Sequence, residues 1–206
     1  MPNLDDFRSL LDCIHKEWNR AEGDIKQAEQ VCSKVIEPAI NELRYAGRRL
    51  IDAIGSANAE GDHRHVESLL TDALFDCHRA RHDAVDAATS KIALDLDILR
   101  DKLGIDVVLQ AFPSFPVLMG EVDSVREKIV ASRKIRENRE NIYTGIEAVD
   151  FPALVSSYNR FKASEPIMRE LAKKRRWERV WTLAFGIIGI VGTIFTVVGW
   201  LFPRSP

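Results

Sequence analysis

Two histidines spaced four residues apart, His78 and His82, are the residues whose type and spacing best suit metal chemistry. On a helix this spacing places both imidazoles on one face, as helical zinc sites require. Arg79, Ala80 and Arg81 stand between them, where a zinc hydrolase would carry a glutamate, and two arginines oppose cation binding. We therefore interpret the pair as part of a charged helix face and expect no metal and no cofactor.

Catalytic motifs of other kinds are absent from the sequence. It has no glycine-rich phosphate loop, no GxSxG and no Cys–His pair in a known catalytic setting. A diiron site would need glutamates on four facing helices, but the helix faces predicted to pack together are apolar or rich in alanine. We expect a protein that is not an enzyme, and the alternative is an enzyme whose site the sequence does not display.

An arginine-rich segment offers the best candidate contact for an anionic ligand. Arg44 and Arg48 are four residues apart on a predicted helix, with Tyr45 beside them, and could form a fork for a carboxylate or phosphate. The competing interpretation is an ordinary solvated face in which acidic neighbours pair with these arginines.

The longest apolar stretch, Trp181–Phe202, lies near the end of the chain. It contains 22 residues without a charge, and tryptophans stand close to both of its ends. As a helix it would extend about 33 Å, enough to cross a hydrocarbon core of about 30 Å. This stretch predicts a single membrane-spanning helix at about residues 181–202.

Basic residues precede the predicted span and set its orientation. The candidate membrane-surface contacts are Lys173, Lys174, Arg175, Arg176, Trp177 and Arg179. Six of the 29 basic and one of the 31 acidic residues lie at or after Lys173, so residues 1–172 carry a net charge of about −7. An acidic domain argues against nucleic acid as a partner, and the basic segment favours an anionic lipid surface. The positive-inside rule places the N-terminal domain in the cytoplasm, as in a tail-anchored protein of a bacterial inner membrane.

Small residues form rows along the predicted span. Thr182, Gly186, Gly189, Thr193 and Thr196 recur every three or four residues, and Gly192 belongs to an adjoining row. Small side chains let helices approach closely in lipid, so this pattern predicts self-association of the span and a homo-oligomer.

The rest of the sequence predicts an all-α fold. Residues 1–112 are expected to form a long, coiled-coil-like antiparallel hairpin, because apolar residues recur at steps of three and four on both sides of a turn at Gly55–Asp62. In the first arm Pro38 should cause a kink. The apolar stripe of the second arm should run from Val66 to Ile98, and Gly104 should end that helix; the stripe of the first arm should include Ile14, Ala21, Ile25, Ala28 and Cys32. Residues 113–165 should add two shorter helices, the first ending at Gly145. Residues 166–206 should form a basic stem, which follows a hinge or kink at Pro166, and the span.

These features favour a membrane-anchored helical interaction module that self-associates and recruits or senses a cytoplasmic protein partner. A second hypothesis is a signal-gated, membrane-perturbing effector of the cell-suicide or phage-defence kind. The three cysteines are widely spaced and are expected to be reduced, Cys32 and Cys77 as small buried side chains.

Overall fold

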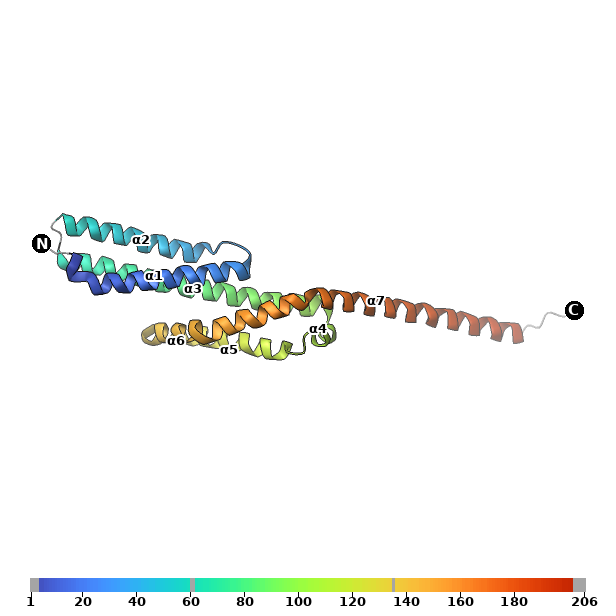
Figure 1. Ribbon diagram of the computed structural model, residues 1–206. Coiled ribbons are helices and arrows are strands. Elements are labelled where there is room, and N and C mark those ends of the chain that lie inside the picture. The colour runs from blue at the N-terminus through green and yellow to red at the C-terminus, as the bar shows by residue number, and fades with distance from the viewer. Residues whose placement is uncertain (1–3, 60–61, 135, 202–206) are drawn as a thin grey trace. The chain divides into compact units, whose positions relative to one another are not determined.

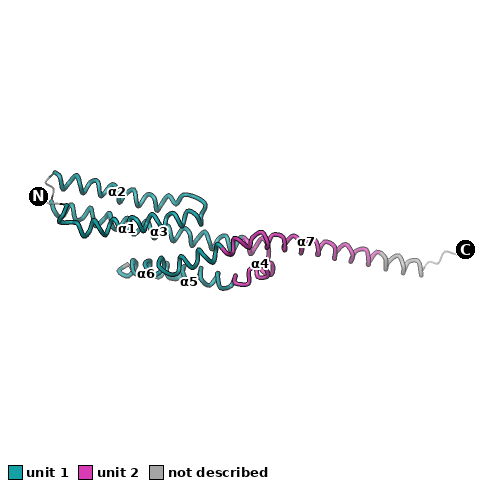
Figure 2. Tube along the Cα trace, in the orientation of Figure 1, with its two compact units in different colours: residues 1–98, 116–159 teal, residues 99–115, 160–206 magenta. Residues whose placement is uncertain are grey.

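The computed structural model describes residues 4–59, 62–134 and 136–201, excluding the side chains of Arg136 and of residues 192–201. All regular structure in these residues is helical, which confirms the predicted all-α class. The chain divides into unit 1, residues 1–98 and 116–159, and unit 2, residues 99–115 and 160–206 (Figure 2).

The first arm of the expected hairpin is two helices, not one kinked helix. After a short turn, η1 (Leu4–Phe7), helix α1 (Arg8–Cys32) ends at Ser33, which adopts a left-handed conformation with φ 53°. Helix α2 (Glu37–Asn58) begins beside Pro38 and returns along α1 (Figure 1). Proline is favoured in the first turn of a helix because the missing N–H has no partner there anyway. Pro38 therefore starts a helix instead of bending one.

The third helix, α3 (His63–Leu103), runs parallel to α1 and antiparallel to α2 within unit 1 (Figure 1). The rings of Phe7, just before α1, and His63 lie 4.5 Å apart between centroids, and Glu17 lies 3.8 Å from His78. Residue numbers on α1 and α3 therefore increase in the same direction. Arg49 and Glu42 of α2 contact Asp76 and Arg79 of α3 in the opposite order. The predicted antiparallel pairing of the first arm with α3 is therefore replaced by an up–down–up arrangement.

The apolar stripes are partly confirmed. On α1, Ile14, Ala21, Ile25, Ala28 and Cys32 are buried, and on α3 so are Val66, Leu70, Ala73, Cys77, Ala80 and Ala84. Beyond Ala84 the buried positions of α3 become Val85, Ala88, Ile92 and Leu96, whereas the predicted Leu94 and Ile98 are exposed. This part of α3 packs against more than one helix, so the positions expected to be buried in a two-helix contact no longer match the buried ones.

The chain then continues through α4 (Ile105–Ala111), α5 (Phe115–Lys134), η2 (Arg136–Asn138), α6 (Arg139–Gly145), the π-helical turn η3 (Ile146–Asp150) and α7 (Phe151–Leu201). Gly104, with φ 85°, ends α3 as predicted. Gly145 does not end a helix as expected but leads directly into η3. At Pro166, where a hinge or kink was expected, α7 continues.

The core of unit 2 includes buried residues of two helices, Val107 and Val108 of α4 and Phe161 and Met168 of α7. Phe112 and Phe161 make an edge-to-face ring contact with centroids 5.5 Å apart. Arg175, in the basic part of α7, donates a hydrogen bond to the Gln110 Oε1 of α4 at 2.9 Å. This part of α7 therefore lies against α4.

Among the residues whose side chains the structure describes, no helix taken alone has both the length and the apolar composition of a membrane span. Only α4 and α5 taken together, with a break between Ala111 and Phe115, have that length and composition. The second half of the predicted span, from Gly192 on, lies outside the side chains that the structure describes.

Candidate functional sites

The most unusual side chain in unit 1 is Arg81, which is completely buried near the middle of α3. An arginine retains its charge in any protein environment, so burying it requires carboxylates that replace the lost water. Glu17 of α1, Glu140 of α6 and Glu147 of η3 all accept hydrogen bonds from its guanidinium, the one to Glu140 at 3.1 Å. Asp24 lies 3.7 Å from the Arg81 Nε. We call these five residues the Arg81 cluster.

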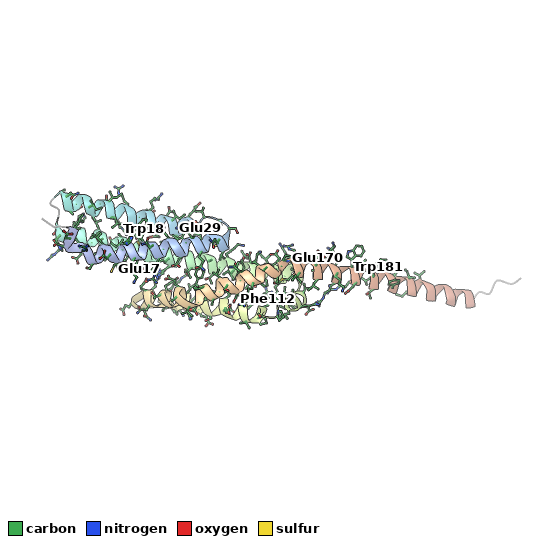
Figure 3. The ribbon with its side chains drawn as sticks, in the orientation of Figure 1. Glu17, Trp18, Glu29, Phe112, Glu170 and Trp181 are labelled. Carbon is green, nitrogen blue, oxygen red and sulfur yellow. The ribbon has the colours of Figure 1, made fainter. Side chains whose placement is uncertain are left out.

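The positions of these carboxylates explain how the cluster forms. Glu17 and Asp24 are seven residues apart on α1 and therefore project from one face, the face beside α3. Figure 3 labels Glu17 together with its neighbour Trp18 on that helix. Glu147 belongs to a π-helical turn, a rare geometry that often occurs at functional positions. Arg81 of α3 thus connects two parts of the chain that are distant from it in sequence, α1 and the continuous α6–η3 segment.

Both histidines of the predicted pair border this cluster. The His78 Nδ1 lies 3.2 Å from the Glu140 Oε2, and the His82 Nε2 lies 3.3 Å from the same oxygen. His82 is buried, stacks on Tyr143 with centroids 3.7 Å apart, and has no hydrogen bond of good geometry at either nitrogen within the described residues. The i, i+4 spacing therefore does bring two imidazoles together, as the sequence suggested, but around a glutamate.

The cluster shifts the pKa values of its members. Burial lowers the pKa of His78 and of His82 and so favours the neutral form of both rings. Burial alone would raise the pKa of Glu140, but contacts with His82, His78 and Arg81 outweigh it and lower that pKa to about 2. Burial raises the pKa of Glu147 to about 7, against the opposing effect of Arg81. Glu140 is therefore the firmly ionised partner of Arg81 at neutral pH.

A metal ion is the other species that such a set of ligands could hold. One ligand atom each from Glu17, His78 and Glu140 lie within 4.8 Å of one another. Arg81 Nη1, however, donates to both of these glutamates, so a guanidinium already supplies the positive charge between them. We therefore interpret the cluster as an ion-pair network that fixes α1, α3, α6 and η3 together.

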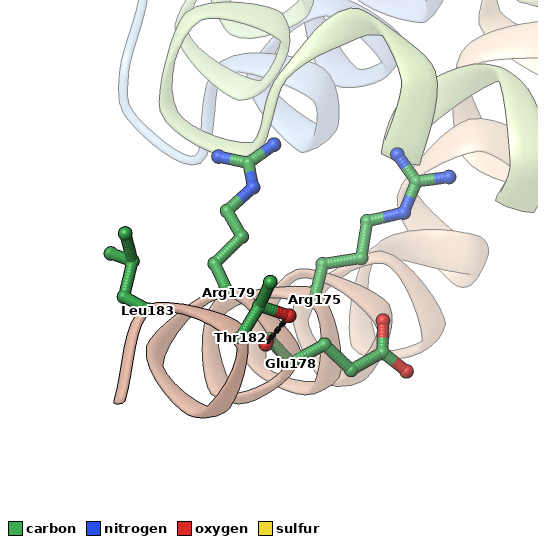
Figure 4. A pocket seen from close by; sticks show the side chains of 5 residues that line it. All are labelled: Arg175, Glu178, Arg179, Thr182 and Leu183. Carbon is green, nitrogen blue, oxygen red and sulfur yellow. Dashed lines mark hydrogen bonds between the residues drawn. The ribbon is translucent and has the colours of Figure 1, made fainter. Parts of the chain in front are cut away.

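The basic residues of α7 form the second candidate site, in unit 2. Arg175 and Arg179 extend in the same direction from α7 (Figure 4), where they line a shallow hollow with Glu178, Thr182 and Leu183. Lys173, Lys174 and Arg176 are exposed, as is Trp177. The predicted membrane-surface residues are therefore at the surface, and Arg175 in addition contacts Gln110 and Asp106 of α4.

From Trp177 to Val191, every large apolar side chain of α7 is exposed. These nine residues are between 46 and 68% exposed: Trp177, Val180, Trp181, Leu183, Phe185, Ile187, Ile188, Ile190 and Val191. Figure 3 shows Trp181 on this part of α7. From Val180 to Val191 they occupy eight of the twelve positions, so they lie on all sides of the helix instead of in one stripe.

The remaining predicted contacts lie on separate surfaces. Arg48 pairs with Asp52 at 3.1 Å and the Arg44 guanidinium lies over the Tyr45 ring at 5.6 Å, so local neighbours already occupy this fork. In the predicted small-residue rows, the Thr182 hydroxyl donates to the Glu178 carbonyl, and a Cβ at Gly186 or Gly189 would meet open space. Gly192, Thr193 and Thr196 lie outside the described side chains.

The chain matches no protein-family model, and it is not detectably similar to any curated protein or solved structure.

Proposed function

We propose that this chain is a non-enzymatic, tail-anchored membrane protein whose helical domain binds a cytoplasmic protein partner. The observation that carries the proposal is the apolar surface of α7, whose large side chains from Trp177 to Val191 are all exposed. Burying one large aliphatic or aromatic side chain is worth about 1.5–3 kcal/mol, so nine exposed ones strongly disfavour water around this segment. A helix that is apolar all round requires lipid or other protein.

The charges next to this surface support the same proposal. Lys173, Lys174, Arg175, Arg176 and Arg179 precede the uncharged stretch from Val180 to Phe202, with Glu178 the single acid among them. Basic residues are retained on the cytoplasmic side and attract anionic headgroups by about 1 kcal/mol each near the surface. The domain before them carries net negative charge, so these residues are its electrostatic contact with the bilayer.

The Arg81 cluster gives the domain its proposed role as a rigid, partner-binding module. A buried ion-pair network adds little net stability but favours one arrangement of the helices over others. The small-residue rows of the span would then assemble copies of the module side by side.

Membrane fractionation tests the proposal. The full-length chain should sediment with membranes and stay there through washes with about 1 M salt and alkaline carbonate, because apolar burial and not charge retains it. Reporters fused to the N-terminus and after Pro206 should give cytoplasmic and external signals respectively. Recovery of the full chain in the supernatant of the carbonate wash would rule out a spanning helix.

A further inference from the structure

A pocket in unit 2 is lined by basic residues of two helices, α3 and α7, and by one apolar residue of a third, α4. Its volume is about 500 Å³, and five cations line it: Lys102 at the end of α3 and Lys173, Arg175, Arg176 and Arg179 of α7. Leu103 and Val107 provide an apolar wall. Lys102 is far from the other four in sequence and was not among the predicted membrane contacts. We call this pocket the basic pocket.

Most of this charge is not neutralised by the described part of the protein. Arg175 donates to the Gln110 Oε1 at 2.9 Å and lies 3.8 Å from Asp106. No ion pair or hydrogen bond joins the side chains of Lys102, Lys173, Arg176 or Arg179 to another described side chain. No acidic residue of the described chain lines the basic pocket. Four uncompensated cations around one cavity favour a ligand with more than one negative charge.

We propose that the basic pocket binds the headgroup of an anionic lipid that ends in a phosphomonoester. Such a group is close to a dianion at pH 7, and arginine and lysine recognise its oxygens by charge-assisted hydrogen bonds. The apolar wall of Leu103 and Val107 suits the glycerol and the first carbons of an acyl chain. The uninterrupted apolar surface of α7 begins at Val180, the residue after Arg179, so the pocket lies at the level where headgroups should be. This inference rests on the proposed membrane anchor.

Adjacent lysines provide a matched test, because Lys173 lines the basic pocket and Lys174 does not. Both are exposed, and both stand at the same level of the predicted membrane surface. A diffuse attraction to anionic lipid would weaken equally when either lysine is neutralised. A defined site should respond to Lys173 and to the distant Lys102, but little to Lys174.

The experiment titrates the full chain in neutral detergent with short-chain phosphatidic acid and measures affinity by calorimetry. Lys102→Gln and Lys173→Gln should each weaken binding about fivefold, and Lys174→Gln less than about twofold. Equal effects of Lys173→Gln and Lys174→Gln, with none from Lys102→Gln, would overturn the pocket in favour of diffuse attraction. Melting temperatures equal to wild type would show that the variants are folded.

Two further measurements complete the experiment. Competition with inorganic phosphate distinguishes a lipid headgroup from free phosphate, and carbonate extraction distinguishes loss of the pocket from loss of the membrane anchor. Inorganic phosphate should compete only at concentrations about a hundredfold higher or more, because it lacks the apolar contacts. Competition at equal concentration would overturn the lipid assignment in favour of a free phosphate. Carbonate extraction of the same variants reports on the anchor alone. Variants that stay in membranes but bind phosphatidic acid like wild type reject the headgroup site and leave the anchor standing.

Discussion

Arg81 of α3 donates a hydrogen bond to Glu147 of the π-helical turn η3, and the two side chains are 0 and 5% exposed. This ion pair joins positions 66 residues apart and fixes the segment between α6 and α7 to the longest helix of unit 1. The same guanidinium binds Glu17 and Glu140, so one side chain determines how α1, α6 and η3 meet α3.

Removing the central charge should therefore be severe. Arg81→Met keeps much of the volume but leaves the carboxylates of the cluster without their shared cation, which should cost about 3–5 kcal/mol of unfolding free energy. Arg79→Met is the matched control: it lies nearby on α3 and its side chain is 57% exposed, so its cost should be below about 1 kcal/mol. Urea denaturation of the full chain in detergent measures both. Similar midpoints for the two variants would show that the cluster does not hold the helices.

The lowered pKa of Glu140 predicts a loss of stability in acid. Its pKa falls from an ordinary 4.5 to about 2 on folding, so it stabilises the fold above pH 4.5 and loses this contribution as the pH drops toward 2. Because its side chain is 37% exposed, screening reduces the effect to about 1–2 kcal/mol.

Glu140→Gln isolates that contribution. The variant should be less stable than wild type at pH 7, and the difference should shrink between about pH 5 and pH 3 as the wild-type protein, which binds fewer protons when folded, loses this advantage. Thermal melts of both proteins across this range give the difference directly. A difference that stays constant with pH would mean that the pKa of Glu140 is not lowered by folding.

The reversal between α1 and α2 depends on the left-handed Ser33. Serine is strained at φ 53°, whereas glycine is not, so Ser33→Gly should stabilise the protein by about 0.5–1 kcal/mol. Ser33→Val introduces a branched side chain that disfavours this conformation further, and it should destabilise the protein by at least as much. Thermal unfolding gives the order of the three proteins. If Ser33→Val left the melting temperature unchanged, one continuous kinked helix would be the better description.

Self-association of the span should depend on its glycines. Replacing Gly189 and Gly192 together by leucine would hold neighbouring helices apart while preserving hydrophobicity, so the chain should still insert but associate more weakly. Leucine at Ile188 and Ile190 is the control of equal hydrophobicity. Crosslinking in membranes compares the subunit numbers, and equal association of both variants would make the glycine row irrelevant. If expression of wild type, but not of the glycine variant, abolished the membrane potential, the membrane-perturbing effector would be the better description.

The helices were largely predictable from the sequence because apolar periodicity depends on local spacing. The stripes Ile14–Cys32 and Val66–Ala84 were predicted correctly, and so was the end of α3 at Gly104. The reversal at Ser33 was missed because the apolar spacing of three and four residues continues across it, through Val35 and Ala39. Pro38 there fits a bend and a helix start equally well, and only the three-dimensional arrangement distinguishes the two.

The Arg81 cluster was not predictable in the same way. The nearest clue was Arg81 itself, a cation between Ala80 and Ala84 of a buried stripe. Its partners Glu17, Glu140 and Glu147 lie 59 to 66 residues away, and nothing in the sequence distinguishes them from the other acidic residues. Only part of the basic pocket was predictable. The α7 cations were predicted as membrane contacts because they precede the apolar stretch, but the presence of Lys102 beside them depends on how unit 2 packs.

A charge placed within the apolar surface of α7 tests whether this helix anchors the chain in lipid. Lysine at the centre of a spanning helix costs about 2.5–3.5 kcal/mol, so Ile187→Lys with Ile190→Lys should abolish insertion. Leucine at both positions preserves the apolar surface and is the control. After alkaline carbonate extraction, we expect wild type and the leucine variant in the membrane pellet and the lysine variant in the supernatant. A lysine variant that stays in the pellet as completely as wild type would contradict a lipid-embedded α7.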